Sequence, residues 1–213
     1  MNLAELMIVE HEPVRNPFAT RHVRPGALAF VFQPGESAAA LVDRLQRHAW
    51  RGEIVGPHGS GKSTLLMALL AELHDHQVPT ILFTLHDGQR RLPVWPKPSL
   101  ANATPPVVVV DGYEQLSLWS RWRLALRCRR QGWGLLVTAH EARGLPLLYR
   151  TESRLDTLRT LVARLDPGAS AWLTDEDLRR HYGECRGDLR ETLFALYDLH
   201  EQRARRALSP AES

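Results

Sequence analysis

A glycine-rich segment of nine residues constrains the fold of this chain more than any other feature. Residues 56–64 read Gly-Pro-His-Gly-Ser-Gly-Lys-Ser-Thr and fit the pattern G-x-x-x-x-G-K-[ST]. Glycines at these places let backbone N–H groups turn inward around phosphate oxygens, and a helix that begins at the lysine adds the positive end of its dipole. The pattern therefore needs a strand before it and a helix after it. With this chain's composition, a chance match arises in roughly one case in a thousand.

The flanking sequence supplies both elements. Residues 53–56 form a short strand that runs into the loop, and residues 62–73 place leucines at helical spacing. We expect Lys62 to bridge the β- and γ-phosphates of a nucleotide and the Ser63 hydroxyl to ligate Mg²⁺. The predicted phosphate-binding residues are Gly56, Pro57, His58, Gly59, Ser60, Gly61, Lys62, Ser63 and Thr64.

A second group of chemical residues follows the clearest strand of the chain. Residues 107–110 are four consecutive valines, as in a parallel strand covered on both faces, and Asp111 comes next. Carboxyl ends of parallel strands meet at one edge of a sheet, so Asp111 is expected beside the loop, where it holds Mg²⁺ through water together with Ser63. Glu114 is either the base that deprotonates an attacking water or an acid that only favours the start of the next helix.

Polar side chains also end the strand expected at 134–138. Thr138 or His140 is placed to contact the γ-phosphate or the attacking water, although a histidine at a strand end is just as often an ordinary loop residue. The other histidines show no metal-binding pattern. His74 and His76 are close in sequence, but residues two apart diverge on a helix.

The alternation of strands and helices predicts an α/β fold with a doubly wound, five-stranded parallel sheet. The expected strands are 53–56, 79–85, 107–110, 134–138 and 145–150, and the expected helices between them are one capped by Ser37, 62–73 and 115–130. The stretch 86–106 holds five prolines and no apolar periodicity, so we expect a loop there. From residue 153 onward the pattern is helical, with helices at 154–165, after a Thr174 cap paired with Asp177, and at 187–206.

Four segments follow from this pattern. Residues 1–35 are an irregular lead-in, 36–152 a nucleotide-binding core, 153–207 a small helical lid, and 208–213 a tail. Hydrophobic residues make up 44% of the chain and charged residues 24%, the balance of an ordinary globular domain, and no apolar run is long enough to span a bilayer. Two cysteines and an N-terminus without a signal-peptide pattern predict a cytoplasmic protein.

Together these motifs resemble the P-loop ATPases of the additional-strand class. An additional strand lies between the phosphate-loop strand and the Asp111 strand, and two strands follow. The helical end is similar to the lid of the AAA+ group. The resemblance implies ATP and Mg²⁺ as ligands, a polar sensor at Thr138 or His140, and a second sensor at Arg190 in the segment Gly187-Asp188-Leu189-Arg190-Glu191.

Other short segments narrow the resemblance or depart from it. Asn16-Pro17-Phe18 is similar to the lead-in of AAA+ proteins from the secretion and transposition branch. AAA+ enzymes usually carry Glu directly after the strand Asp, whereas Gly112 intervenes here. Asp-Gly-x-Glu at 111–114 instead resembles the signalling ATPases of the NACHT/STAND kind, some of which are slow switches. The chain lacks an Asn-Lys-x-Asp motif, which favours ATP over GTP, and it lacks the Leu-Ser-Gly-Gly signature of transporter ATPases.

Arginine supplies 25 of the 27 basic residues. Arg123, Arg127 and Arg130 fall on one face of the helix expected at 115–130. They form either a stripe for nucleic-acid phosphates or a solvated face, and the arginine bias of the chain favours the solvated face. The apolar side of the same helix is expected to carry Leu118, Trp119, Trp122, Ala125 and Leu126.

Oligomeric ATPases of the resembled group present an arginine in trans. Arg143, Arg150 and Arg154 follow the sensor region, and Arg150 at a strand end is the first choice among them. A homo-oligomer is therefore left open. The partner whose state is coupled to the nucleotide is either a protein or a nucleic acid.

Three functions are compatible with this sequence. The leading one is a Mg²⁺-dependent, AAA+-like ATPase that couples nucleotide state to lid movement and to a macromolecular partner. The second is a slow or non-hydrolysing ATP-dependent switch. The third is a P-loop phosphotransferase whose small acceptor lies in a pocket walled by 86–106.

Overall fold

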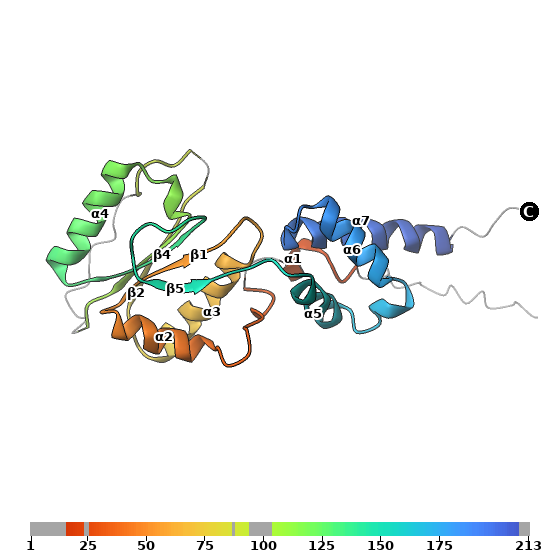
Figure 1. The fold of residues 1–213 in the computed structure, drawn as a ribbon, viewed down its shortest axis with the longest axis horizontal. Helices are drawn as coiled ribbons and strands as arrows, with labels where there is room; N and C mark the ends of the chain where they lie inside the picture. Colours follow the sequence, from red (N-terminus) through yellow and green to blue (C-terminus); the bar gives the residue numbers. More distant parts are fainter. Residues whose placement is uncertain (1–15, 24–25, 87, 94–103, 209–213) are drawn as a thin grey trace, which may run out of the picture.

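The computed structural model describes residues 16–23, 26–86, 88–93 and 104–208 of the 213-residue chain. It consists of an α/β core and a helical lobe, which lie side by side along the longest axis (Figure 1). The helical lobe contains α1 (Thr20–Val23), α5 (Leu155–Leu165), α6 (Asp175–Glu184) and α7 (Leu189–Leu208). Part of the loop expected at 86–106 and most of the tail expected at 208–213 lie outside the described residues.

The core is built on five parallel strands. These are β1 (Arg51–Val55), β2 (Thr80–Thr84), β3 (Val107–Asp111), β4 (Gly134–Ala139) and β5 (Leu147–Arg150), in the order β2-β3-β4-β1-β5. The prediction of a five-stranded parallel α/β sheet is confirmed. The strand that lies between β1 and β3 in the sheet is β4, whereas the strand between them in the sequence, β2, lies at the edge.

Helices cover both faces of this sheet. On one face, α2 (Ala38–Arg47) and α3 (Lys62–Asp75) pack against side chains such as Ile54 and Val109. On the other face, α4 (Leu118–Gln131) packs against Val108 and Val110 (Figure 1). Successive valines of β3 therefore enter opposite halves of the core, because side chains alternate along a strand. This double coverage explains why the strand is wholly apolar.

The helix expected at 115–130 is interrupted. A short 3₁₀ turn, Tyr113–Gln115, follows β3, and α4 begins only after Ser117, whose hydroxyl accepts a hydrogen bond from Ser120 N at 3.2 Å. Leu124 and Cys128 are the buried residues of α4. Because they face the sheet, the apolar side that begins at Leu118 points away from it. The exposed large residues of this helix are Leu118 (79%), Trp119 (63%) and Trp122 (54%).

Both helix caps expected from the sequence are present. Ser37 accepts a hydrogen bond from Ala40 N, and Thr174 and Asp177 form a reciprocal capping box at the start of α6. Such caps satisfy backbone donors that have no partner within the helix.

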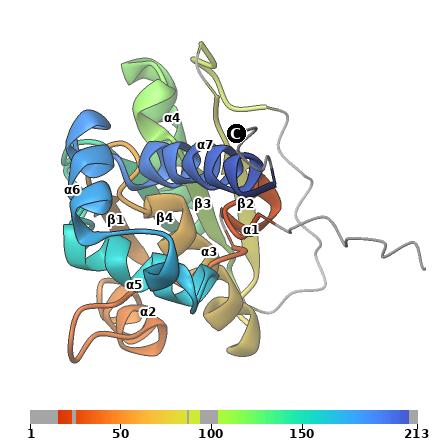
Figure 2. The same cartoon turned by 90° about the vertical axis from the view of Figure 1, so that its right-hand side faces the viewer.

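Residues from both ends of the chain form the helical lobe. Phe18 is fully buried among Leu158, Leu189 and Leu196. The Asn16 amide donates to Tyr197 O at 3.0 Å and to a Glu201 carboxylate oxygen at 2.8 Å. Figure 2 shows α1 beside α7, in front of the sheet. Residues 16–23 thus belong physically to the lobe that α5–α7 complete, whereas Phe30 and Phe32, further along the same segment, pack against the core.

Within the described ranges, no helix has the length and apolar character needed to cross a membrane. Cys128 is buried in α4 and Cys185 lies partly exposed after α6, and both are free thiols.

Candidate functional site

The glycine-rich loop connects β1 to α3 at the carboxyl edge of the sheet. Gly59 and Gly61 have φ values of 63° and 88°, and Gly61 is the N-cap of α3. This left-handed conformation is readily adopted only by glycine. The loop therefore curls back at the head of α3, where backbone N–H groups without partners and the helix dipole favour an anion.

Gly56 is required for a different reason. A Cβ atom added there would lie 2.0 Å from Thr151 Oγ1 and 2.6 Å from Thr151 O, at the end of β5. The Ser60 hydroxyl donates to Pro57 O at 2.7 Å and lies 2.7 Å from Thr151 Oγ1. Thr151 thus fixes the beginning of the loop against the neighbouring strand.

Gly56→Ala is expected to destabilise the protein by about 1–3 kcal/mol, because overpacking a tight site forces its neighbours to shift. Urea unfolding measures this change. Gly183→Ala is the matched control, since Gly183 lies within α6, where an added Cβ meets nothing within 4 Å, and alanine in a helix is favoured by about 0.5–1 kcal/mol. Equal stability of Gly56→Ala and the wild type would contradict this close contact.

Lys62 bends back over the loop. Its ammonium donates to Gly56 O and Pro57 O, both at 2.7 Å. Burial lowers the pKa of Lys62 from its usual 10.5, while the negative charges of Glu114, Asp111 and Asp188 raise it in opposition. The only lysine among the described residues therefore lies within electrostatic reach of three carboxylates. Its hydrogen bonds to the two carbonyl oxygens can be replaced by hydrogen bonds to a stronger acceptor, such as a phosphate.

Asp111 and Thr138 form a hydrogen-bonded pair across β3 and β4. The Thr138 hydroxyl is buried, donates to Asp111 Oδ1 at 2.5 Å and accepts from Gly112 N at 2.9 Å. The Thr138 hydroxyl therefore both donates and accepts a hydrogen bond within the protein. In this geometry Thr138 orients the Asp111 carboxylate rather than facing the space above the loop.

Glu114, His140 and His58 form a connected group at the same edge. Glu114 Oε1 lies 3.1 Å from His140 Nε2, and the His140 ring contacts the His58 ring of the loop with centroids 3.8 Å apart. Burial lowers the pKa of His140 below 6.5, against the opposing charge of Glu114. A lowered pKa favours the neutral imidazole at pH 7, and in the tautomer that carries its proton on Nε2 this ring can donate to the carboxylate. The second oxygen, Glu114 Oε2, is buried without a hydrogen-bond partner.

The helical lobe reaches the loop through Asp188. A Cβ atom added at Gly59 would lie 1.8 Å from Asp188 Oδ1, so this carboxylate rests directly against the loop. The same oxygen caps α7 by accepting from Arg190 N at 2.9 Å and Glu191 N at 3.0 Å. The Arg190 side chain is exposed and lies over the Phe194 ring of its own helix.

The remaining predicted residues lie near the site or on its borders. Ser63 and Thr64 occupy the first turn of α3 and are partly exposed. Arg150 is exposed at the end of β5, and Arg154 pairs with Glu152. Arg143 contributes its backbone N–H, which donates to a Glu53 carboxylate oxygen at 2.8 Å.

Several residues of this region carried no sequence signal. A cavity of about 40 Å³ adjoins the loop at Ser60, and its walls include Phe30, Val31, Gln33 and Tyr149. Phe30 stacks edge-on against Tyr149 and would contact a Cβ at Gly61. In the sequence these residues before α2 fall within the irregular lead-in predicted for 1–35, because their place beside the loop depends on tertiary packing.

Two charged residues outside the predicted site, buried Glu53 and partly buried Arg121, contact residues around it. Glu53 is 1% exposed within β1 and holds the turn after β4 through Arg143 N. Arg121 Nη2 donates to Glu114 O at 2.7 Å, and its guanidinium lies over the Tyr113 ring. A charged residue inside an apolar strand or helix face is the one signal that marks either of them in the sequence.

The described residues contain no group of three or more His, Cys, Asp or Glu side chains arranged to hold a metal ion. A Mg²⁺ site built from one hydroxyl, one carboxylate, waters and nucleotide phosphates does not need such a group. No protein-family model and no curated protein matches this chain.

Proposed function

We propose that this protein is a Mg²⁺-dependent, AAA+-like P-loop ATPase that couples nucleotide state to movement of the helical lobe and to a macromolecular partner. The observation that carries the proposal is the convergence on Lys62. The amine at the head of α3 lies within electrostatic reach of Asp111 and Glu114, which come from the end of β3 and the turn after it. Three residue types that phosphoryl transfer requires thus meet at one edge of a parallel sheet.

The sheet order is compatible with the proposed site. The loop strand β1 and the Asp111 strand β3 both pair in parallel with β4, so their carboxyl ends lie at the same edge of the sheet. The additional strand that the sequence places between β1 and β3 is β2, which lies at the edge of the sheet beside β3. The helical lobe, which touches the loop at Gly59, occupies the place of the lid.

Each part of the chain has a distinct role in this proposal. Backbone N–H groups of residues 58–64 bind phosphate oxygens, and Lys62 exchanges its two carbonyl partners for the β- and γ-phosphates. Ser63 and Asp111 hold Mg²⁺, with Asp111 oriented by Thr138. The ion, when bound, neutralises charge that develops on the phosphate oxygens. Glu114 accepts a proton from the attacking water, and its Oε1 lies 3.1 Å from His140 Nε2.

A slow switch is the second candidate, and Asp188 favours it. Its carboxylate rests on Gly59, where it repels an incoming phosphate. Phosphate entry then requires Asp188, and the α7 terminus that it caps, to withdraw from the loop. A protein of this kind changes shape on binding ATP even when turnover is small.

The test is to measure ATP binding and phosphate release by the purified protein with Mg²⁺ and with EDTA. Mg²⁺-dependent turnover of ATP, with GTP weaker, is the expected result. Tight binding without turnover supports the switch, and turnover that needs an added small acceptor supports the phosphotransferase. A protein that binds no nucleotide under any of these conditions would overturn the proposal.

Thr138→Val is expected to weaken the apparent affinity for Mg²⁺, measured through ATP binding, by about 10–100-fold. Residues that orient a metal ligand typically contribute that much to metal affinity. Titrating Mg²⁺ at fixed ATP measures the shift. The control is Thr160→Val, which removes a partly exposed hydroxyl that donates to Asp156 O within α5. An unchanged Mg²⁺ titration for Thr138→Val would show that Asp111 needs no such support.

A further inference from the structure

Two tryptophans lie stacked on the outer side of α4. The Trp119 and Trp122 rings have centroids 4.9 Å apart and planes inclined by 21°. They are 63% and 54% exposed, and Leu118 beside them is 79% exposed. Residues of this size usually bury much of their area, so a cluster of them in solvent marks a surface for interaction.

The same helix is strongly cationic. It contains five arginines and no acidic residue. Two of them are used within the fold, since Arg121 lies over Tyr113 and Arg127 lies over Trp133. The other three, Arg123, Arg129 and Arg130, are exposed. No ion pair joins these three to a carboxylate of the residues that the structure describes.

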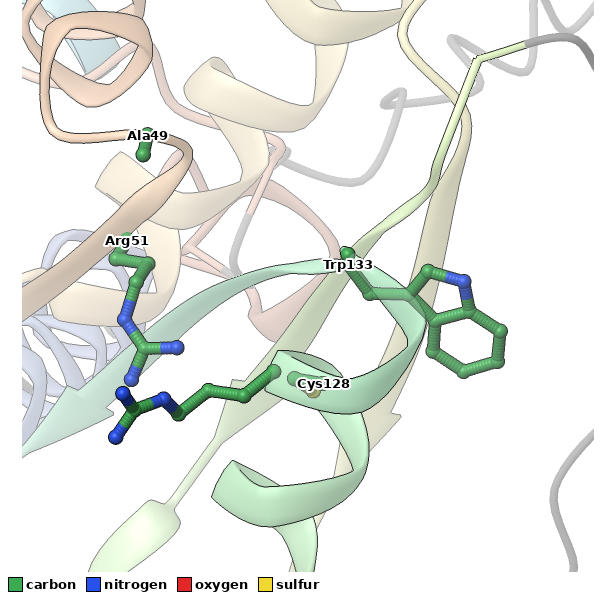
Figure 3. A pocket seen from close by; sticks show the side chains of 6 residues that line it. Ala49, Arg51, Cys128 and Trp133 are labelled. Atoms are coloured by element: carbon green, nitrogen blue, oxygen red, sulfur yellow. The ribbon is translucent and has the colours of Figure 1, made fainter.

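Aromatic and cationic side chains follow one another along the helix. Trp122 and Arg129 are seven residues apart, which is about 10 Å along the axis. Arg129 also lines a cavity of about 430 Å³ together with Arg51 and Trp133. Figure 3 shows Arg51 extending from the start of β1 towards α4, close to Cys128. The cationic surface therefore continues past the end of α4 to the amino ends of the strands.

We propose that the outer face of α4 binds single-stranded nucleic acid. Bases stack on Trp119 and Trp122, and phosphates of the following nucleotides contact Arg123, Arg130 and the Arg129–Arg51 cavity. A single strand offers bases and phosphates in turn along its length, and proteins bind it by combining aromatic platforms with a cationic track. The face lies opposite the helices α2 and α3 and away from the helical lobe (Figure 1).

The arrangement fits a strand better than a bilayer. A helix on a membrane separates apolar from charged side chains around its axis, with the apolar face down along its whole length. In α4 the side opposite the tryptophans is not open to solvent, because Leu124 and Cys128 on that side pack against the sheet. The exposed arginines cannot therefore lie on the opposite side from the tryptophans. Arg129 and Arg130 therefore share the outer side with the tryptophans and follow Trp122 by seven and eight residues along the helix, while Arg123 follows it directly.

The test is fluorescence anisotropy of labelled dT20 and rU20 with the full chain at low salt. Trp119→Ala/Trp122→Ala is expected to weaken binding by at least about tenfold, and Trp119→Phe/Trp122→Phe to retain most of it, because any aromatic ring can stack on a base. Arg123→Gln/Arg130→Gln is expected to weaken binding and to reduce the slope of log K against log salt by about 1.4, or about 0.7 per phosphate contact. The matched control is Arg205→Gln/Arg206→Gln, which removes the same charge from the exposed end of α7.

Each outcome decides the matter. Loss of binding in both α4 variants, but not in the control, supports the proposal. Equal binding by wild type and the Trp119→Ala/Trp122→Ala variant would overturn it. Tryptophan-dependent binding to phosphatidylserine vesicles, without binding to either oligonucleotide, would assign the face to membranes instead. None of these measurements depends on nucleotide hydrolysis. Their results therefore test the nucleic-acid surface independently of the proposed ATPase activity.

Discussion

Glu114→Gln is expected to lower the rate of ATP hydrolysis by about 10²–10⁴-fold, the usual contribution of a positioned general base. Glutamine keeps the shape of the side chain but cannot accept a proton from water. Its amide can still contact His140 Nε2, which lies 3.1 Å from Glu114 Oε1 in the wild type. ATP affinity is therefore expected to stay within a few-fold of wild type.

Single-turnover hydrolysis and nucleotide titration together measure these two quantities. The matched control is Glu141→Gln, an exposed carboxylate that follows His140 in the same loop. If Glu114→Gln hydrolyses ATP at the wild-type rate, another group activates the water and the turn after β3 has only a structural role. If it loses ATP affinity instead, Glu114 acts through the position of Lys62.

Lys62→Ala is expected to weaken ATP binding by at least about 30-fold, because truncating one partner of a desolvated charge pair costs about 2–5 kcal/mol. Burial lowers the pKa of this ammonium below 10.5. The charged form that binds phosphate is therefore lost earlier than for an ordinary lysine as pH rises. Wild-type ATP affinity should fall in the alkaline range, and the affinity of Lys62→Ala should not follow that fall.

Isothermal titration of ATP at several pH values measures both effects. Lys97→Ala removes the same charge from the only other lysine in the chain and is the control. Urea unfolding of Lys62→Ala checks that the loop is still folded, since Lys62 holds Gly56 O and Pro57 O. Wild-type affinity in a folded Lys62→Ala protein would contradict the proposed phosphate site.

Most elements of the core could be predicted because each has a local cause. The four valines before Asp111 form β3, and the capping residues Ser37 and Thr174 lie where α2 and α6 begin. The order of strands has no such cause, since any parallel strand can pair with any other. The position of β4 between β1 and β3 emerges only from the packing of the whole sheet.

The candidate site likewise has parts that the sequence predicts and parts that it does not. The loop and Asp111 have fixed spacings to strands and helices, so their meeting at one sheet edge was foreseeable. The pairing of Thr138 with Asp111, and the contact of Asp188 with Gly59, depend on side-chain positions across 27 and 129 residues of sequence. A periodic pattern contains no information of that kind. On α4 the pattern placed the tryptophans on one side, but only the structure decides which side meets the sheet.

The burial of Phe18 and the hydrogen bonds of Asn16 to α7 have a mechanical consequence. Because the helical lobe is made from both ends of the sequence, the α/β core is topologically an insertion within it. Two covalent connections, one before α2 and one after β5, therefore join the two bodies. If nucleotide binding moves the lobe, two connections restrict that movement to a rotation about the line between them. Deleting residues 1–23 would then remove part of the lobe and cut one of the two connections.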